Sequence, residues 1–381
     1  MIPLAIPDTR GNEAKYLLEC IETNFVSSVG PFVTQFEERV AQACSAPYTV
    51  ATSSGTTGLH VALTALGVGR DDLVLLPTFT FIATANAVAH CGAMPWLVDI
   101  AANSWTMDPQ KLQEAMQRHA VRHEGRVLHR PTGRRVAAIM PVYTLGTPAD
   151  MDRIREIACE WGLPIVADAA AALGARYKGA EIAELADLTV FSFNGNKTVT
   201  AGGGGAVAGL DGKLLDLVRH LSTTARIGTD YDHDRVGFNY RMTNIQAAVG
   251  CAQMERLEEF VSAKRRIRAD YDNAFIHVKG LELFPCPSWA ESACWFSGLT
   301  LRDPNLPSIA EICARLRVAG IEARKFWKPI HLQAPYAEAP RSDVSVAEGL
   351  WEKVLTLPCS TSLKQVDQER VIQTLKGVLG V

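Results

Sequence analysis

Short apolar runs alternate with longer amphipathic segments through the first two-thirds of the chain. Five of these runs are typical of strands buried on both faces of a sheet: Leu73–Leu76, Met94–Val98, Ala137–Tyr143, Pro164–Ala167 and Leu188–Phe193. Between the third and the fourth run, residues 149–162 place apolar side chains at the 3.6-residue spacing of a helix. Because a helix between strands favours a parallel connection, the pattern predicts an α/β fold with a mostly parallel central sheet.

The last third of the chain has a different pattern. A second helical periodicity extends from Asn244 to about Phe275, and short predicted strands and helices with several prolines follow it. We therefore place a domain boundary near Gly250. Residues 1–250 are expected to form a large domain and residues 251–381 a smaller α+β domain, with the long helix bridging the two.

Composition excludes several classes of protein. With 48% hydrophobic and 21% charged residues among 381, the chain is not disordered, and its net charge of −3 gives no electrostatic sign of nucleic-acid binding. No apolar run approaches the length of a membrane span, and no secretory leader is recognisable. The nine cysteines include no C-x-x-C pair, which argues for reduced thiols in the cytoplasm and against a structural metal site.

Two basic segments stand outside this pattern. Residues 118–135 contain six arginines and three histidines, and His119 and His123 have the i, i+4 spacing of a metal pair on a helix. No H-E-x-x-H arrangement supports a metal, so a solvated helix end and loop is the favoured interpretation. Lys264-Arg265-Arg266 is likewise expected on the solvent-exposed face of the long helix.

A run of small residues, Ser53–Gly58, precedes an amphipathic helical pattern. The free N–H groups at such a helix start can hold a phosphate, although on this motif alone an ordinary N-cap is the commoner explanation. Neither a Walker A motif nor a G-x-G-x-x-G fingerprint occurs, which counts against nucleoside triphosphate or dinucleotide binding.

Two further positions suggest a carbonyl chemistry. Asp168 ends an apolar strand, where α/β sheets bind ligands, and a carboxylate there could hold a protonated ring nitrogen or simply cap a helix. Lys197 follows another buried strand, and partial burial would lower its pKa and free the amine for Schiff-base formation. Ser192 precedes it by five residues and could donate a hydroxyl to a phosphate. Taken together, the Ser53–Gly58 run, Asp168 and the segment around Lys197 outweigh the structural explanation of each.

A collinear set of motifs now resembles a known family, the pyridoxal-phosphate-dependent nucleotide-sugar aminotransferases of the DegT/StrS type. The resemblance covers nearly the whole chain. It rests on GNEAKYLLECIETNFVSSVGPFVTQFEE, SSGTTGLHVAL, PTFTFIATANAV, GTPADMD, VADAAAALGA, FSFNGNKTVTAGGGGAV, GFNYRMTNIQAAVGCAQ, ARKFWKPIHLQ and LPCSTSL. The NGNK and FVSSVGPFV segments look most like the branch that serves bacillosamine and legionaminic acid synthesis. The implied fold is fold-type I.

The resemblance also implies roles for individual positions. Lys197 matches the lysine that bonds to the cofactor and moves the proton, and Asp168 matches the partner of the pyridine nitrogen. The other cofactor positions that match are Gly55, Thr56, Phe81, Ser192 and, reaching a neighbouring subunit, Asn239. The positions resembling nucleotide-sugar contacts are Asn24, Phe25, Val26, Ser27, Arg324, Lys325, Phe326 and Trp327.

The activity implied by the resemblance is a transamination with pyridoxal 5'-phosphate as cofactor. L-Glutamate would donate the amino group to a 4-keto-6-deoxy sugar nucleotide, most simply a UDP-2-acetamido-4-keto-2,6-dideoxyhexose. A 3-keto sugar, or a GDP- or dTDP-linked 4-keto sugar, is the alternative. The implied assembly is a homodimer with shared active sites. The residue that binds the donor carboxylate stays open, with Arg241 as one candidate.

Two residues depart from the family pattern, and three other functions compete. Ala171 stands where Gln or Glu is usual, and Tyr143 where His is frequent. A sugar dehydratase on the same fold would have histidine in place of Lys197, and a non-catalytic relative would draw its support from Ala171 alone. A nicotinamide-dependent dehydrogenase lacks its glycine fingerprint here.

Overall fold

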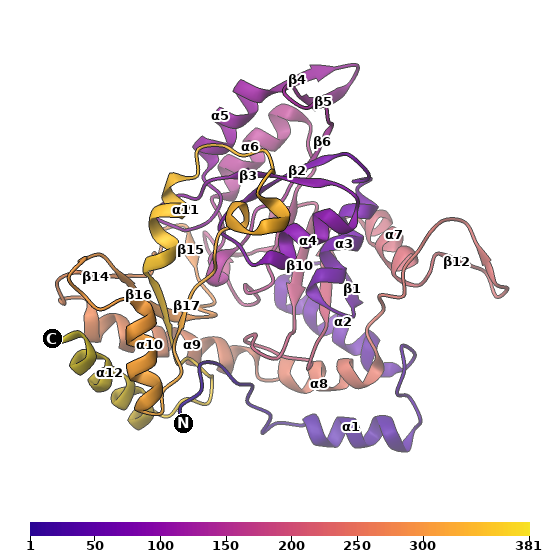
Figure 1. Ribbon diagram of the computed structural model, residues 1–381. Coiled ribbons are helices and arrows are strands. Elements are labelled where there is room, and N and C mark those ends of the chain that lie inside the picture. Colours follow the sequence, from indigo (N-terminus) through magenta and orange to yellow (C-terminus); the bar gives the residue numbers. More distant parts are fainter.

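The strands of the central sheet alternate their side chains between two hydrophobic cores. In the computed structural model, which describes residues 1–381 (Figure 1), strand β2 (Leu73–Pro77) directs Leu73 and Leu75 into one buried cluster and Val74 and Leu76 into another. Because successive side chains of a strand point to opposite faces, an apolar run must be covered on both sides.

Seven strands make up the central sheet. Their order is β1 (Tyr48–Thr52), β11 (Gly205–Gly209), β10 (Leu188–Ser192), β7 (Val166–Asp168), β6 (Val136–Ile139), β2 and β3 (Met94–Val98). Two isolated parallel bridges, Ile139 to Ile165 and Val142 to Asp168, join the β6 and β7 segments. Only β11 is antiparallel to its neighbours. The predicted α/β fold with a mostly parallel sheet is confirmed, and each of the five predicted strands is present.

Helices cover both faces of this sheet. One face packs against α3 (Gly55–Ala65), α4 (Ile82–His90) and α7 (Gly212–Ser222). The other packs against α2 (Pro31–Cys44), α5 (Pro109–His119), α6 (Met151–Trp161) and α8 (Asn244–Met254), and α1 (Glu13–Glu22) lies along α8 at the edge of the molecule (Figure 1). The helix predicted over residues 149–162 is α6.

The predicted long helix is two helices. The chain leaves helical geometry at Arg256, with φ −115° and ψ 15°, between α8 and α9 (Leu257–Phe275). At the break, the Arg256 guanidinium donates to the buried carboxylate of Asp8 at 3.2 Å and to Glu259. These polar contacts fix the kink, and the apolar periodicity alone did not reveal them.

A second, antiparallel sheet organises the C-terminal part. Its order is β14 (Leu281–Leu283), β16 (Ser297–Leu301), β18 (Val354–Leu357) and β17 (Arg324–Lys325), and it packs against α9, α10 (Ile309–Val318) and α12 (Gln365–Leu379). Ile2 and Leu4 belong to this same hydrophobic cluster. The domain boundary near Gly250 stays a prediction. Ile2 and Leu4 precede this boundary in the sequence but pack with the C-terminal part.

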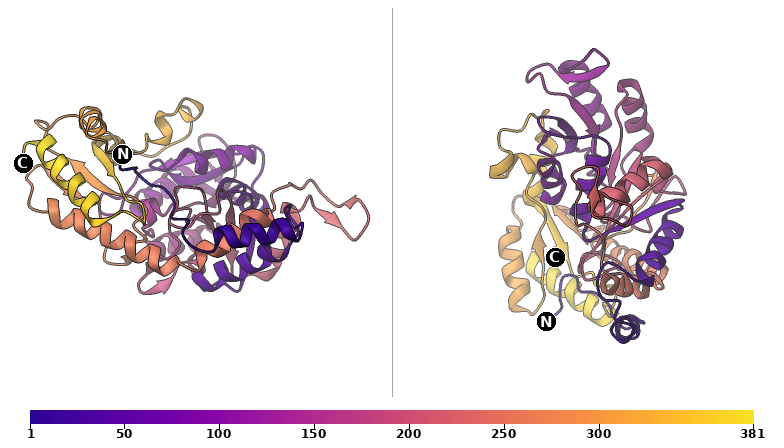
Figure 2. Two further views of the ribbon diagram at one scale, coloured as in Figure 1. Left: turned by 90° about the horizontal axis from the view of Figure 1, so that it is seen from below. Right: turned by 90° about the vertical axis from the view of Figure 1, so that its right-hand side faces the viewer.

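The remaining elements are short. They are β4 (Ala120–His123), β5 (Arg126–His129), β8 (Arg176–Tyr177), β9 (Ala180–Glu181), β12 (Arg226–Ile227), β13 (Asp232–His233), β15 (Ala290–Glu291), α11 (Ser345–Leu350) and five 3-10 turns. The β12–β13 hairpin projects far from the body of the protein (Figure 2). No helix has the length and apolar character needed to cross a membrane. All nine cysteines are free; four of them are buried and two are exposed.

The two basic segments differ in outcome. His119 ends α5 and His123 ends β4, so the pair does not share a helix, and the Arg-rich segment is a helix end followed by the β4–β5 hairpin. The expectation for Lys264 is wrong. Its side chain is buried on the inner face of α9, and only Arg266 of this basic triplet is exposed.

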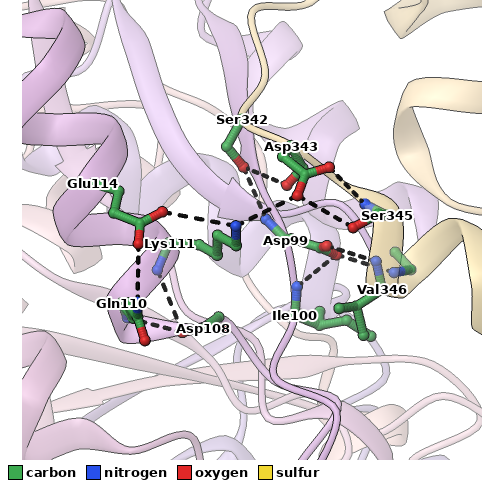
Figure 3. Close-up of polar contacts among 11 residues, drawn as sticks. Asp99, Ile100, Asp108, Gln110, Lys111, Glu114, Ser342, Asp343, Ser345 and Val346 are labelled. Carbon is green, nitrogen blue, oxygen red and sulfur yellow. Dashed lines mark hydrogen bonds and ion pairs between the residues drawn. The ribbon is translucent and has the colours of Figure 1, made fainter.

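Buried Asp99, which follows β3, ties the two parts of the chain together (Figure 3). Its carboxylate accepts hydrogen bonds from the N–H groups of Val346 at 2.8 Å, Ala347 at 3.0 Å and Ile100 at 2.8 Å. The Asp99 N–H in turn donates to the Ser342 hydroxyl at 3.2 Å. One side chain therefore fixes the first turn of α11 against the central sheet.

Replacing Asp99 with alanine is expected to lower the free energy of unfolding by about 3 kcal/mol or more, because three N–H groups lose their acceptor in a buried setting. Urea denaturation followed by circular dichroism measures the effect. Asp343→Ala is the matched control: this neighbouring carboxylate is 60% exposed and pairs with Lys111 at 3.4 Å, so its removal should cost less than about 1 kcal/mol. Equal losses for the two variants would contradict the role of Asp99.

Candidate active site

A cavity of about 550 Å³ opens at the carboxyl ends of β7 and β10. This is the edge at which open α/β sheets bind ligands, and the volume suits a small organic molecule. Residues from both parts of the chain line it. Ten of the predicted site residues are among them: Gly55, Thr56, Phe81, Asp168, Ser192, Lys197, Arg324, Lys325, Phe326 and Trp327.

The start of α3 forms one end of the cavity. Ser54 caps the helix in a capping box with Thr57, which leaves the N–H groups of Gly55 and Thr56 in the first turn without an acceptor inside the helix. Gly55 lies against Ser192 at the end of β10, since a Cβ built on Gly55 would be 2.8 Å from the Ser192 Cβ. Only glycine admits this approach. N–H groups and a hydroxyl thus converge where an anion binds well.

Asp168 is buried at the end of β7. Its Oδ2 accepts a hydrogen bond from the Thr84 hydroxyl at 2.7 Å, and its Oδ1 accepts one from the Ala170 N–H at 3.1 Å. Burial raises the pKa of Asp168, whereas these two donors and the Lys197 ammonium act to lower it. The carboxylate is held in place and available to a cationic partner.

Lys197 is half-buried and follows β10 by a short turn in which its N–H donates to Asn194 O at 3.0 Å. Its Nζ lies 3.8 Å from the centroid of the Trp295 indole. Burial lowers the pKa of Lys197 to about 8, and the charge of Asp168 partly offsets the effect. About a tenth of this amine is therefore neutral and nucleophilic at pH 7, far more than for an exposed lysine.

Aromatic rings form the wall facing the C-terminal part. Phe81 is 54% exposed, although it is a large apolar side chain, and its ring centroid lies 5.9 Å from that of Trp327. Trp327 stacks on Phe326 at 4.2 Å. Beside them, Arg324 is exposed and forms no ion pair, while Lys325 pairs with the exposed Glu352 at 3.2 Å. The wall offers flat apolar surfaces next to positive charge.

Five predicted residues lie outside this cavity. They are Asn24, Phe25, Val26, Ser27 and Asn239. The loop after α1 is held instead by Asn244, whose side-chain amide donates to Phe25 O at 2.8 Å. Arg241 does not line the cavity either. Within one chain, the structure brings the predicted cofactor residues together, with Asn239 as the exception, and leaves the first group of substrate residues apart.

Sequence reasoning missed three residues that shape the site. The Thr84 hydroxyl donates to Asp168, and the Trp295 indole contacts the amine of Lys197. Asn196 lines the cavity, and its side-chain Oδ1 is buried without a hydrogen-bond partner. Thr84 lies one helical turn after Thr80, whose hydroxyl is 2.8 Å from its own, and this spacing was a usable signal. Trp295 is far away in sequence, and no local pattern marks it.

The two departures from the family pattern both line the cavity. Ala171 leaves room beside the site, and the Tyr143 hydroxyl is buried without a hydrogen-bond partner. Burial raises the pKa of Tyr143, so this phenol is neutral at any physiological pH. An unpaired buried hydroxyl is costly, which is consistent with a ligand group completing its hydrogen bond.

A lysine and a carboxylate facing one cavity, beside an anion-binding helix start and an exposed aromatic ring, are what a pyridoxal-phosphate-dependent enzyme requires. The family model of the DegT/DnrJ/EryC1/StrS aminotransferase family matches residues 7–376. The chain belongs to this family and is a pyridoxal-phosphate-dependent aminotransferase.

Relatives and solved structures agree with this assignment. The chain is 37% identical to the GDP-perosamine synthase of Caulobacter vibrioides, over 99% of this chain and 98% of that protein. It is 32% identical to the UDP-2-acetamido-2-deoxy-3-oxo-D-glucuronate aminotransferase of Pseudomonas aeruginosa, over 87% and 86%. The structure of a putative sugar aminotransferase from Streptococcus pneumoniae in its PMP form superposes with a TM-score of 0.89, at 25% identity, over 100% and 99% of the two chains.

The residues present fit the cofactor. The N–H groups at the start of α3 and the Ser192 hydroxyl would bind the phosphate. Because Gly55 has no side chain, its backbone lies directly against Ser192. Phe81 would stack on the ring, Asp168 would hold its nitrogen, and Lys197 would bond to the aldehyde, since all three residues line the cavity. In contrast, no group of three or more His, Cys, Asp or Glu side chains is arranged to hold a metal ion.

Proposed function

We propose that the protein transfers the amino group of L-glutamate to a nucleotide-linked 4-keto-6-deoxy sugar and releases 2-oxoglutarate. The observation that carries the proposal is that half-buried Lys197 and buried Asp168 line one cavity together with Trp327 and the exposed Arg324. The first pair suits amino-group chemistry, and the second suits a diphosphate linked to a flat base.

Each residue has a defined task in this proposal. Pyridoxal phosphate supplies an aldehyde and a ring that accepts electron density. The Lys197 amine, once free, takes a proton from the donor carbon and returns one to the acceptor carbon, for which a pKa of about 8 is well matched. Asp168 stabilises a proton on the ring nitrogen. The aromatic wall would cover one side of the reacting atoms.

For the nucleotide we propose guanosine diphosphate, one of the alternatives raised from the sequence, in place of uridine diphosphate. The relative named GDP-perosamine synthase supports this choice, since it is more similar to this chain than the relative named for a UDP-linked 3-oxo sugar, and it forms a 4-amino sugar. The more specific resemblance to the bacillosamine and legionaminic acid branch finds no support in these relatives.

A panel of GDP-, UDP- and dTDP-linked 4-keto sugars, assayed with glutamate by coupled detection of 2-oxoglutarate, tests the choice. We expect kcat/KM for the GDP-linked substrate to exceed the others by about 10²-fold or more, because a site built to hydrogen-bond one base leaves polar groups unpaired with another. Highest turnover of a UDP-linked 2-acetamido substrate would reinstate the prediction made from the sequence. No turnover of any 4-keto sugar would contradict the proposed reaction.

We further propose that the protein is a homodimer with shared active sites, and that it works in the cytoplasm. Apolar side chains are exposed along α1 and its loop, including Ile21 and Val29, and on the projecting β12–β13 hairpin, where Tyr231 is 86% exposed and Val236 is 84% exposed. A second copy of the chain would cover them. Asn239 and the loop of residues 24–27, which lie outside the cavity of their own chain, would then reach the cavity of the partner.

Sedimentation equilibrium is expected to give twice the 41.4 kDa mass of the chain. Tyr231→Asp combined with Val236→Asp should raise the dimer dissociation constant at least about 10²-fold, since charged groups replace buried apolar contacts. Ile276→Asp, at a position 57% exposed after α9, is the control and should leave the mass unchanged. A wild-type mass of 41.4 kDa at micromolar concentration would refute the dimer.

A further inference from the structure

Trp295 is fixed more firmly than an ordinary core tryptophan. Its indole Nε1–H donates to Asn196 O at 2.7 Å, and its N–H donates to Leu145 O at 3.0 Å. The ring packs against Phe296 and Trp327, with centroids 4.2 Å and 5.8 Å away, and it also contacts the Lys197 amine at 3.8 Å. The indole thus holds both the backbone just before Lys197 and the end of the Lys197 side chain.

A second lysine completes the arrangement. Lys264 on α9 is 1% exposed, and its Nζ donates to Trp295 O at 2.9 Å and to Cys359 O at 2.6 Å. No carboxylate pairs with it. Burying an amine against two carbonyl groups and the Cys359 thiol, with no carboxylate, is expensive, whereas an apolar side chain would fill the same space at lower cost. Packing alone therefore does not explain a lysine at this position. Its hydrogen bond fixes the backbone carbonyl of Trp295.

We propose that Trp295 is a positioning residue for Lys197, and that Lys264 holds Trp295 in register through the backbone carbonyl. Whenever the Lys197 amine is not bonded to the cofactor, the indole face keeps it beside the cavity and favours its ammonium form. The inference rests on the role of Lys197 in the proposed function. It adds residues that the resemblance to the family did not assign.

The physical basis is the attraction between a cation and an aromatic face, which strengthens when water is excluded. A free lysine side chain has four rotatable bonds, so holding its amine in one position also lowers the entropic cost of reaching the proton that it transfers. The other charged or titratable groups that face the same cavity are Asp168 from β7, Tyr143 after β6, and Arg324 and Lys325 from β17. Of these, Asp168 also favours the ammonium form of Lys197, and Tyr143 is neutral.

The first test needs no cofactor and no substrate. In the cofactor-free full chain, the rate at which acetic anhydride labels Lys197, followed by mass spectrometry across pH, reports the pKa of this amine. Trp295→Leu keeps an apolar side chain but removes the ring, so the midpoint is expected to fall by about half to one and a half pH units. Trp295→Phe should retain most of the wild-type midpoint. An unchanged midpoint in Trp295→Leu would overturn the proposal.

The second test uses the loaded enzyme. We expect Trp295→Leu and Lys264→Met to lower kcat about tenfold or more with little change in KM for the sugar nucleotide, and to shift the pH profile of the glutamate half-reaction to lower pH. Trp161→Phe is the control, because this indole packs on Arg122 outside the cavity. A rise in KM without a shift in the pH profile would overturn the positioning role.

A failure of the positioning role can be distinguished from a failure of the proposed function. The labelling midpoint depends only on the environment of Lys197 and is measured without any sugar nucleotide. A shifted midpoint in Trp295→Leu together with an inactive wild-type enzyme would contradict the proposed substrate and leave the positioning role intact. If Lys264→Met fails to fold, the two Trp295 variants still decide.

Discussion

Lys197→Ala is expected to reduce transamination by about 10⁴-fold or more, while the folded structure is retained. The Lys197 amine lines the cavity beside Asp168, and its pKa is about 8. No other basic group in this cavity has a pKa lowered toward neutrality. Loss of the Lys197 amine removes both the covalent attachment of the cofactor and the proton transfer in each half-reaction, and the two effects are large. Stopped-flow measurement of the half-reaction with glutamate quantifies the loss.

The same lysine predicts the direction of the pH dependence. In the cofactor-free chain, burial lowers the pKa of Lys197 below that of an exposed lysine, so the neutral amine becomes populated as the pH rises through about 8. Labelling of Lys197 should therefore increase up to that pH and then level off.

Lys213, which is exposed on α7, is the matched control for Lys197→Ala: Lys213→Ala should leave turnover unchanged. Turnover within tenfold of wild type in Lys197→Ala would remove this residue from the mechanism.

Asp168→Asn is expected to lower the rate about 10³-fold and to weaken cofactor binding. An amide has no negative charge with which to stabilise the proton on the ring nitrogen, so the ring loses its capacity to accept electron density. The Thr84 hydroxyl and the Ala170 N–H donate to different oxygens of Asp168, and asparagine keeps only one of these two acceptors in a buried setting. Absorbance titration with pyridoxal phosphate, together with single-turnover rates, measures both effects.

Thr84 provides a graded control for this second prediction. Thr84→Val keeps the shape but removes the hydrogen bond to Asp168 at 2.7 Å, which raises the pKa of the carboxyl and should cost about tenfold in rate. Thr84→Ser keeps the hydroxyl and should remain close to wild type. The expected order of rates is Thr84→Ser, then Thr84→Val, then Asp168→Asn. A rate in Asp168→Asn equal to that in Thr84→Val would contradict the assigned role of the charge.

The strands and the centre of the site could be predicted because local patterns encode them. An apolar run such as Leu73–Leu76 must be buried on both faces, and residues that follow parallel strands, such as Asp168 and Lys197, meet at one edge of the sheet. Trp295 could not be predicted in this way. It reaches Lys197 through a fold in which 99 positions separate its indole from its partner Asn196.

Charged residues account for the errors. A lysine in a helical pattern was expected in solvent, yet Lys264 finds its partners Trp295 and Cys359 at 31 and 95 positions away. Likewise the break between α8 and α9 depends on Asp8, which lies 248 positions from Arg256. Periodicity measures how apolar a helix face is, and it carries no information about distant polar partners.

Ile2 and Leu4 pack against the C-terminal cluster, so they can reach their native contacts only after the end of the chain has been synthesised. Ile2 bonds to Gly320 and Glu322, Leu4 accepts from Cys359, and Ile6 donates to Ser360, 354 positions later. At a synthesis rate of about 5–20 residues per second, the ribosome takes roughly 20–70 seconds to deliver the second partner after the first. The central sheet can form in that interval, but the early apolar residues must wait unpaired. A chaperone that shields Ile2 and Leu4 during this interval is therefore expected to raise the yield of folded protein.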